Sequence, residues 1–356
     1  MDPSIFESHL NELSNKLQNF KNLDKDEVLN AGHALISEEC PDPAKETFLS
    51  SWQRKGETPE EVSVLASLFR EKARNPELHD FSERAIDIVG TGGDKAGTFN
   101  LSTTTALVVA AAGVPVIKHG NRSITSKTGS ADLLESLEVP LQANNSLLRK
   151  SIEERNFCFL FAPGFHPAFK AIMPVRKAMA ARGEKTVFNI LGPLINPAQP
   201  KYELMGVFSQ QWVDPLAEVL TSLGLKRGLV AHSQIDGQDL DEISALGGTH
   251  LSGVGGITES EVNEIQSIID QGRVGSLHDL KGGDSETNQA IFRAILNNQA
   301  NEALTATITL NAGIALWIAE KATTVSEGIS LTDDLIKSGV FKKWVQETKE
   351  FFKNVA

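Results

Sequence analysis

The chain has 356 residues, with 46 acidic and 34 basic side chains, a net charge of −12, and 40% hydrophobic and 22% charged residues. This length can bury a hydrophobic core and suggests two domains at roughly 150 residues each, while the composition excludes disordered, collagen-like and coiled-coil chains. The negative charge argues against nucleic acid as the main partner, although backbone amides and a few placed cations can still bind a phosphate ester.

No targeting segment or membrane span is expected. The first 17 residues are acidic and amphipathic, and they lack the basic start and apolar stretch of a secretory signal. The most apolar segment, residues 106–117, is too short to cross a bilayer and is broken by a glycine and a proline. The two cysteines, Cys40 and Cys158, lack metal-ligand spacing and are expected to be buried thiols. We therefore expect a cytoplasmic protein without a membrane partner.

The N-terminal residues 4–73 carry apolar side chains at the three- and four-residue spacing of amphipathic helices. Thr58 precedes a proline and two glutamates, which is the order of an N-cap, a first-turn proline and an acidic first turn. Asp24 marks another helix start. The pattern predicts a small helical domain over residues 1–75, with a helical contribution from about 167–185.

From residue 84 onward, short β-branched runs alternate with helix patterns. The runs predict strands at 85–89, 114–120, 158–163, 204–208 and 228–232. The intervening patterns predict helices at 103–112, 131–137, 145–154, 167–182, 215–223, 259–271, 285–297, 305–322 and 331–352. This alternation predicts a large α/β domain over 84–356, with a mainly parallel central sheet flanked by helices.

A glycine-rich loop follows the first predicted strand. Gly90, Gly92 and Gly93 allow the backbone to approach a ligand that a Cβ atom would block. The polar side chains at the start of the next helix are Asn100, Ser102 and Thr103. Free N–H groups and the helix dipole favour an anion there. The pattern indicates a pyrophosphate site, with a plain strand-to-helix turn as the alternative.

Polar and cationic residues follow the second predicted strand. They are Lys118, His119, Asn121, Arg122 and Lys127. Ligands of open α/β sheets bind at the carboxyl ends of the strands, and this cluster suits phosphate and carboxylate groups. The alternative is a solvated basic loop.

An acidic pair, Asp241 and Glu242, comes after the last predicted strand. Mg²⁺ prefers carboxylate oxygens together with water and substrate phosphates, so two adjacent acids that face a pyrophosphate could hold it. Acidic pairs are more often simply solvated surface residues.

These segments together resemble the anthranilate phosphoribosyltransferase family over nearly the whole chain. The runs GTGGD at 90–94, KHGNRS at 118–123 and FNILGPLINPA at 188–198 occur in the family's order with the acidic pair. The resemblance implies a small helical domain packed on a larger α/β domain, as in the nucleoside-phosphorylase-like phosphoribosyltransferases, with a dimer formed through the helical part. It also implies Mg²⁺-dependent transfer of phosphoribose from phosphoribosyl pyrophosphate to anthranilate, a step of tryptophan biosynthesis.

The resemblance also implies roles for single residues. Phosphoribosyl pyrophosphate would contact Gly90, Thr91, Gly92, Gly93, Asp94, Thr98, Asn100, Ser102, Thr103, Lys118 and Ser130. Anthranilate would contact Gly90, His119, Asn121, His166, Arg176 and Pro193. Mg²⁺, two ions per monomer, would bind at Ser102, Asp241 and Glu242. Arg176 would pair with the anthranilate carboxylate, and no covalent nucleophile is required because positioning and electrostatics suffice. On the residues alone, His166 could instead cap a helix and Arg176 could pair with an acid of the protein.

The chain departs from the family pattern in several places. Lys95 follows GTGGD where glycine is usual, about three extra residues follow Arg176, and Lys185 replaces a common arginine. The approach to the acidic pair, at 236–242, is also altered. The alternatives to the favoured activity are a pyrimidine nucleoside phosphorylase of similar fold and a non-catalytic paralogue that binds nucleic acid.

Overall fold

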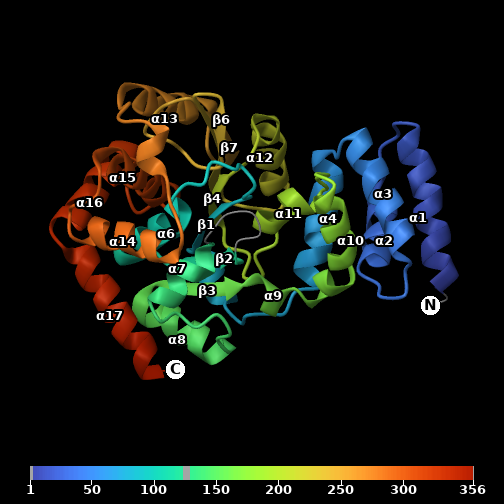
Figure 1. The fold of residues 1–356 in the computed structure, drawn as a ribbon, viewed down its shortest axis with the longest axis horizontal. Coiled ribbons are helices and arrows are strands. Elements are labelled where there is room, and N and C mark those ends of the chain that lie inside the picture. The colour runs from blue at the N-terminus through green and yellow to red at the C-terminus, as the bar shows by residue number, and fades with distance from the viewer. Residues whose placement is uncertain (1–2, 123–128, 356) are drawn as a thin grey trace.

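The computed structural model describes residues 3–122 and 129–355. Helices α1 to α4 form one end of the molecule, and the α/β part forms the other (Figure 1). The bounds of these helices are α1 Pro3–Gln18, α2 Lys25–Leu35, α3 Asp42–Lys55 and α4 Pro59–Glu71. The side chains of Asp24 and Thr58 cap α2 and α4 as predicted, each accepting the backbone N–H three residues further on. Helix α10, Met173–Ala181, packs against α3, which agrees with the expected contribution of later residues to the helical end.

The described part of the chain contains a seven-stranded sheet in the order β3-β2-β1-β4-β5-β6, with β7 also paired to β5. Its strands are β1 Ile86–Gly90, β2 Val116–Gly120, β3 Phe157–Phe161, β4 Tyr202–Gly206, β5 Arg227–Ile235, β6 Gln238–Leu240 and β7 Thr249–Gly255. The pairs from β3 to β5 are parallel, whereas β6 and β7 run antiparallel to β5. The fold is therefore the α/β class with a mainly parallel central sheet that the alternating pattern predicted.

Helices cover the sheet on both faces (Figure 1). The helices of the α/β part, some of which pack on other helices, are α5 His79–Ser82, α6 Leu101–Ala111, α7 Ser130–Ser136, α8 Asn145–Arg155, α9 Ala162–Phe165, α11 Phe188–Leu194, α12 Val213–Ser222, α13 Glu259–Gln271, α14 Ser285–Leu296, α15 Glu302–Ile318, α16 Val325–Lys337 and α17 Val340–Val355. Short 3₁₀ helices are η1 Pro167–Ala171, η2 Gln210–Trp212 and η3 Leu277–Leu280. Helix α15 is buried along almost its whole length and packs on α6 and α16, so its apolar sequence serves the core.

Several sequence predictions of single elements were wrong. The helix predicted at 167–182 is divided into η1 and α10, because Pro174 lies in the first turn of α10 and cannot continue a preceding helix. The helix predicted at 331–352 is α16 and α17, separated at Gly339, whose φ of +81° ends a helix. Strands β6 and β7 were missed, since their polar residues lie at an antiparallel edge where the apolar alternation is weak.

Hydrophobic side chains pack on both faces of the sheet. One cluster joins α6, α15 and the C-terminal helices to one face. The other joins α1 to α4 with α10, α11, α12 and the opposite face of β4 and β5, so that the helical end shares its core with the sheet. Cys40 and Cys158 are both buried, as expected. Within the described residues, no helix is long and apolar enough to cross a membrane.

Glu61 holds the helical end together from inside. Its buried carboxylate accepts the backbone N–H groups of Leu23 and Thr58 at 2.7 and 3.0 Å, and the indole N–H of Trp52 at 2.7 Å. It also pairs at 2.6 Å with Lys55, whose side chain is only 3% exposed. A buried ion pair of this kind is costly to break, because the remaining charge loses its partner.

We predict that Glu61→Gln destabilises the protein by about 3 kcal/mol, because the amide leaves the buried Lys55 ammonium unpaired. Urea unfolding followed by circular dichroism measures the change. The matched control is Glu12→Gln, an exposed glutamate of α1, which should stay within about 0.5 kcal/mol of the parent. Equal stability of the two variants would show that Glu61 does not organise this end.

Candidate active site

The segments singled out from the sequence meet at the carboxyl ends of β1, β2 and β4. In the parallel pair of β1 and β4, Gly90 lies opposite Gly206. The N–H of Thr91 continues this pairing and donates to the carbonyl of Gly206 at 3.0 Å. The glycine-rich loop therefore leaves β1 directly beside the end of β4.

The acidic pair lies against this loop. The N–H of Gly92 donates to Oδ2 of Asp241 at 2.6 Å. A Cβ on Gly90 would lie 2.5 Å from Oδ2 of Asp241, and a Cβ on Gly206 would lie 1.6 Å from its carbonyl oxygen. Only glycine at these two positions leaves room for Asp241. Sequence reasoning missed Gly206, although a glycine inside the strand predicted at 204–208 was a possible signal of a close backbone approach.

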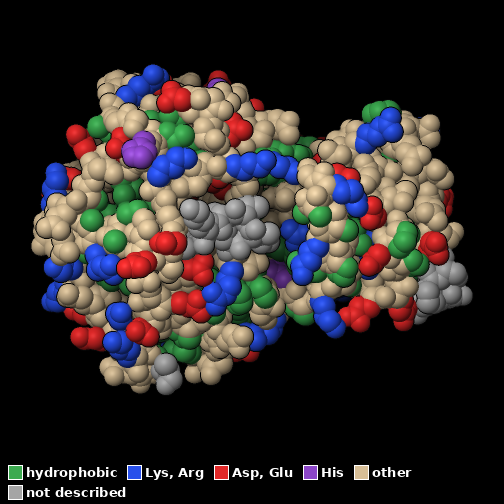
Figure 2. All heavy atoms as spheres, in the orientation of Figure 1, with side chains coloured by type: hydrophobic (Ala, Val, Ile, Leu, Met, Phe, Trp, Pro, Cys, Tyr) green, Lys and Arg blue, Asp and Glu red, His purple; other side chains and the backbone are tan. Residues whose placement is uncertain are grey.

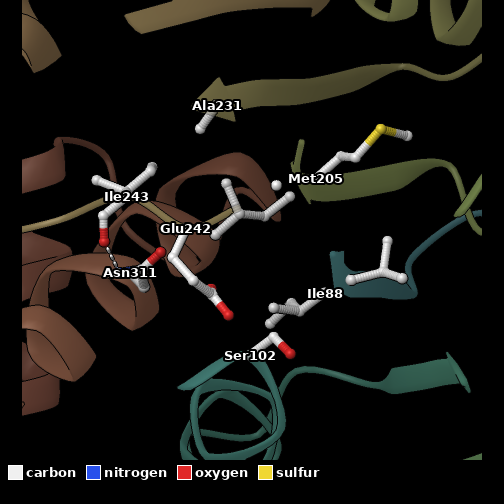
Figure 3. Close-up of a pocket in the computed structure, with 10 residues that line it drawn as sticks. Ile88, Ser102, Met205, Ala231, Glu242, Ile243 and Asn311 are labelled. Atoms are coloured by element: carbon white, nitrogen blue, oxygen red, sulfur yellow. Dashed lines mark hydrogen bonds between the residues drawn. The ribbon is translucent and has the colours of Figure 1, made fainter. Parts of the chain in front are cut away.

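Glu242 points toward Ser102, the second residue of α6, across a small pocket between β1 and β4 (Figure 3). The backbone N–H of Ser102 lowers the pKa of Glu242, but its effect is smaller than that of burial, which raises it. Both residues remain partly exposed, whereas most of the surrounding side chains are buried. Asn311 of α15 fixes the segment that follows, because its side chain donates to the carbonyl of Ile243 at 2.7 Å (Figure 3). No sequence signal pointed to this role of Asn311.

The acids at this site repel one another. Burial, and then the charge of Asp94, raise the pKa of Asp241 from its ordinary 3.8 to about 7. Burial and the neighbouring Asp241 raise the pKa of Glu242 well above its usual range, although the Lys118 ammonium opposes this. A bound cation would relieve that repulsion, so the residues present fit a divalent metal.

The composition of the site suits Mg²⁺ in particular. Among the described residues, no three or more His, Cys, Asp or Glu side chains are grouped so that they could hold a metal ion by themselves. Two carboxylates and a hydroxyl, from Asp241, Glu242 and Ser102, are too few to enclose a metal. They leave positions for water and substrate phosphates, which is how Mg²⁺ is commonly bound.

A buried polar network supports the strand that carries Lys118 and His119. One Asp87 oxygen accepts the N–H of His119 at 3.3 Å, and the other accepts the side chain of Asn196 at 2.8 Å. The Lys118 ammonium donates to the carbonyl of Ile88. Burial raises the pKa of Asp87 to about 6, although Lys118 opposes this. Lys118 is buried beneath the loop, and Asn196 is a supporting residue that sequence reasoning missed.

Aromatic rings line the side of the site that faces the helical end. The rings of His119 and His166 lie edge to face with centroids 5.0 Å apart, and His166 contacts Phe169 in the same way at 5.8 Å. The Nε2 atoms of both histidines have no hydrogen-bond partner in the described part of the chain. Burial lowers the pKa of His119 well below 6.5 and that of His166 to about 4, so both rings are neutral at pH 7.

Arg176 lies against the same group of aromatic rings. Its guanidinium carbon lies 5.4 and 5.3 Å from the ring centroids of Phe169 and Phe188. Within residues 3–122 and 129–355 it pairs with no carboxylate, and burial lowers its pKa. An arginine without an acidic partner, stacked between rings, is suited to bind a carboxylate from outside the protein. The alternative of an ion pair within the protein is not observed there.

The remaining predicted residues lie around the same edge of the sheet. Asn100 donates to the carbonyl of Gly129, next to Ser130 at the start of α7, and Thr98 forms a β-bridge with Lys281. Thr103 is buried, Asn121 is exposed, and Pro193 lies in α11.

Not every residue of the predicted cationic cluster can supply positive charge to the site. Arg122 forms ion pairs with Asp132 and Glu135 at 3.1 and 2.7 Å, so its charge is already compensated. Lys127 lies outside the described residues. Figure 2 shows a row of Lys and Arg side chains across the middle of the molecule, between the α/β part and the helical end.

The chain is similar to known proteins along nearly its whole length. The family described as "Glycosyl transferase family, a/b domain" matches residues 82–341. An anthranilate phosphoribosyltransferase of Persephonella marina is 38% identical over 346 residues, which cover 97% of this chain and 99% of that protein. One from Shewanella sp. (strain ANA-3) is 39% identical over 90% of each chain.

Solved structures give the same picture. The anthranilate phosphoribosyltransferase of Thermus thermophilus superimposes with a TM-score of 0.83 at 38% identity, over 96% of this chain and 99% of that one. The Saccharomyces cerevisiae anthranilate phosphoribosyltransferase in complex with PRPP and Mg has a TM-score of 0.79 over 98% of each chain. Its 21% identity shows a likeness of fold.

The raised pKa of Asp241 predicts a pH-dependent stability. A carboxyl with a higher pKa in the folded than in the unfolded state binds more protons when folded between the two values, so its contribution to the unfolding free energy falls as pH rises from about 4 to about 7. Asp241→Asn, which still accepts the Gly92 N–H, should therefore raise the melting temperature by about 2–4 °C at pH 8 in metal-free buffer, and by less at pH 5.

Thermal unfolding with and without Mg²⁺ checks this prediction. Mg²⁺ should raise the melting temperature of the parent protein and should have a smaller effect on Asp241→Asn. The control variant is Glu264→Gln, at an exposed position of α13. A variant that is less stable than the parent at pH 8 without metal would contradict the mutual repulsion of these acids.

Proposed function

The chain belongs to the anthranilate phosphoribosyltransferase family, and on that premise we propose that the cleft at the carboxyl ends of β1, β2 and β4 transfers phosphoribose to anthranilate. The activity is Mg²⁺-dependent transfer from phosphoribosyl pyrophosphate, which gives N-(5-phosphoribosyl)anthranilate and pyrophosphate. The observation that carries the residue assignment is the contact of Gly92 with Asp241, because it joins the anion-binding loop to the acidic pair in one site.

Phosphoribosyl pyrophosphate lies, in this proposal, across the glycine-rich loop and the start of α6. The bare backbone of the loop and the first turn of α6 offer N–H groups to the phosphates. The residues proposed to contact it are Gly90, Thr91, Gly92, Gly93, Asp94, Thr98, Asn100, Ser102, Thr103, Lys118 and Ser130. Lys118 contributes its positive charge from beneath the loop, since its ammonium is held by the carbonyl of Ile88.

We assign Mg²⁺, two ions per monomer, to Ser102, Asp241 and Glu242. The repulsion between the two acids and the opening of Glu242 and Ser102 toward the pocket support this assignment. The S. cerevisiae relative is in complex with PRPP and Mg. When bound, Mg²⁺ supplies positive charge that stabilises the departing pyrophosphate.

Anthranilate binds, in this proposal, beside the aromatic rings around Arg176. The residues proposed to contact it are Gly90, His119, Asn121, His166, Arg176 and Pro193. Arg176 supplies the cation for the carboxylate, and the neutral rings of His119 and His166 add a flat surface without charge repulsion toward the amine. The unpartnered Nε2 atoms of the two histidines can hydrogen-bond to the ligand.

Catalysis in this site depends on position and charge. The aniline nitrogen of anthranilate is neutral at pH 7, so it can attack the anomeric carbon without a strong base in the protein. The loop amides hold the leaving pyrophosphate while the ribose gains positive charge, and Arg176 holds the acceptor on the opposite side for in-line attack. Neither a covalent nucleophile nor a redox cofactor enters this mechanism.

The two-domain boundary near residues 75–84, the homodimer through the helical end and the cytoplasmic location remain predictions. The shared hydrophobic core of the helical end and the sheet supports an arrangement in which the two parts act together.

The decisive assay mixes the protein with phosphoribosyl pyrophosphate, Mg²⁺ and anthranilate, and follows the loss of anthranilate fluorescence. Turnover should fall by tenfold or more, on the order of 1.4 kcal/mol, in the double variant Asp241→Asn with Glu242→Gln. Turnover of uridine or thymidine with phosphate would support a pyrimidine nucleoside phosphorylase instead. A gel shift that depends on surface lysines would support nucleic-acid binding. No consumption of anthranilate would overturn the proposed acceptor.

For Arg176→Lys and Arg176→Ala, we predict a raised KM for anthranilate, larger for alanine, with the KM for phosphoribosyl pyrophosphate nearly unchanged. Lysine keeps the charge but loses the planar fork that matches a carboxylate. Lys177→Ala, the exposed next residue of α10, serves as control. If the donor KM rises instead, Arg176 does not bind the acceptor.

A further inference from the structure

Two lysines, Lys95 and Lys185, lie in or near the glycine-rich loop that follows β1. Lys95 is an exposed residue of the loop itself, in the left-handed region with a φ of 61°. The side chain of Gln238 in β6 donates to the carbonyl of Asp94 at 2.8 Å and so fixes the loop next to Lys95. Lys185 lies in the connection between α10 and α11, on the side of the helical end.

Phe208 fixes Lys185 relative to the loop. The ammonium of Lys185 lies 3.4 Å from the centroid of the Phe208 ring, a cation–π contact. The backbone N–H of Phe208 donates to Oγ1 of Thr91 at 3.0 Å, so this aromatic support is bound to the second residue of the loop. Burial lowers the pKa of Lys185, and the charge of Lys95 lowers it further, although Asp239 opposes this effect.

Within the described residues, neither lysine has a hydrogen bond or an ion pair within 4 Å. This contrasts with Arg122 at the same edge of the sheet, which is paired with two carboxylates. The chain carries a net charge of −12, so acidic partners are plentiful elsewhere on its surface. Lys95 lies near enough to Lys185 for its charge to lower the pKa of Lys185, and two neighbouring cations favour an anion between them.

We propose that Lys95 and Lys185 form a cationic clamp that binds the pyrophosphate group of phosphoribosyl pyrophosphate from the solvent side of the loop. The clamp rests on the proposed function and specifies which side chains hold the outer phosphates. In this arrangement the acidic pair and its metal contact the pyrophosphate on the side of the strand ends. The two ammonium groups contact it on the solvent side of the loop. Each ammonium is a strong charge-assisted donor to phosphate oxygens.

The clamp also joins two parts of the chain. Lys95 belongs to the loop after β1, whereas Lys185 follows α10, which packs on α3 of the helical end. A phosphate held by both lysines therefore links the helical end to the loop when the donor is bound.

Steady-state kinetics of Lys95→Asn, Lys185→Met and the double variant test the clamp. Asparagine tolerates the left-handed backbone at position 95, and methionine keeps the length of the lysine at 185 while removing its charge. The double variant should raise the KM for phosphoribosyl pyrophosphate roughly tenfold, while kcat and the KM for anthranilate change less than about twofold. Lys185→Arg keeps the positive charge, so its KM for phosphoribosyl pyrophosphate should stay close to that of the parent.

Calorimetric titration with pyrophosphate and Mg²⁺ separates the clamp from the proposed function, because it requires no turnover. The double variant should bind pyrophosphate roughly tenfold more weakly than the parent, and added salt should weaken binding less in the variant than in the parent. The control is Lys226→Met, which pairs with Glu83 at the opposite ends of the strands and should leave binding unchanged.

Three results would overturn the clamp. Unchanged pyrophosphate affinity and unchanged donor KM in the double variant would do so. A rise in the anthranilate KM alone would assign Lys185 to the acceptor. Equal effects of Lys185→Met and Lys185→Arg would show that packing on Phe208 matters and the charge does not. Absence of anthranilate turnover together with weakened pyrophosphate binding in the variant would reject the proposed acceptor and leave the clamp standing.

Discussion

The close approach of Asp241 to the ends of β1 and β4 determines the architecture of this site. It requires glycine at both Gly90 and Gly206, because a Cβ at either position would collide with Asp241. It also gives the loop a fixed partner, since the N–H of Gly92 donates to the Asp241 carboxylate. Without this contact, the acidic pair and the anion-binding loop would be separate surface features.

The same approach concentrates negative charge in a buried place. Asp241, Glu242 and Asp94 lie close enough for their charges to raise the pKa values of Asp241 and Glu242, and the buried Lys118 offsets only part of that charge. Such an arrangement is unfavourable for the protein alone and becomes favourable when a metal and a polyanion bind together. The fold thus holds acidic side chains close together at a site where bound ligands relieve their repulsion.

The acceptor side depends on contacts between the helical end and the sheet. Arg70 of α4 donates to the carbonyl of Leu194 at 2.7 Å, and the buried Lys45 of α3 donates to the carbonyl of Ala171 at 2.9 Å. These contacts hold η1, α10 and α11, which carry the aromatic rings around Arg176. The aromatic rings around Arg176 are therefore held in place by helices α3 and α4, which lie far from them in sequence, and their arrangement follows from how the two parts pack.

Local sequence pattern was enough to predict the α/β class, the capped helices at Asp24 and Thr58, and the motifs at the strand ends, because helix period, strand alternation and glycine placement are local properties. It did not assign roles to Gly206, Asn196 or Asn311, since each acts on a residue distant in the chain. It also could not tell whether Arg122 or Arg176 was available to bind a ligand. That distinction emerged from the folded chain, because pairing of a charge depends on which carboxylates the fold brings within reach.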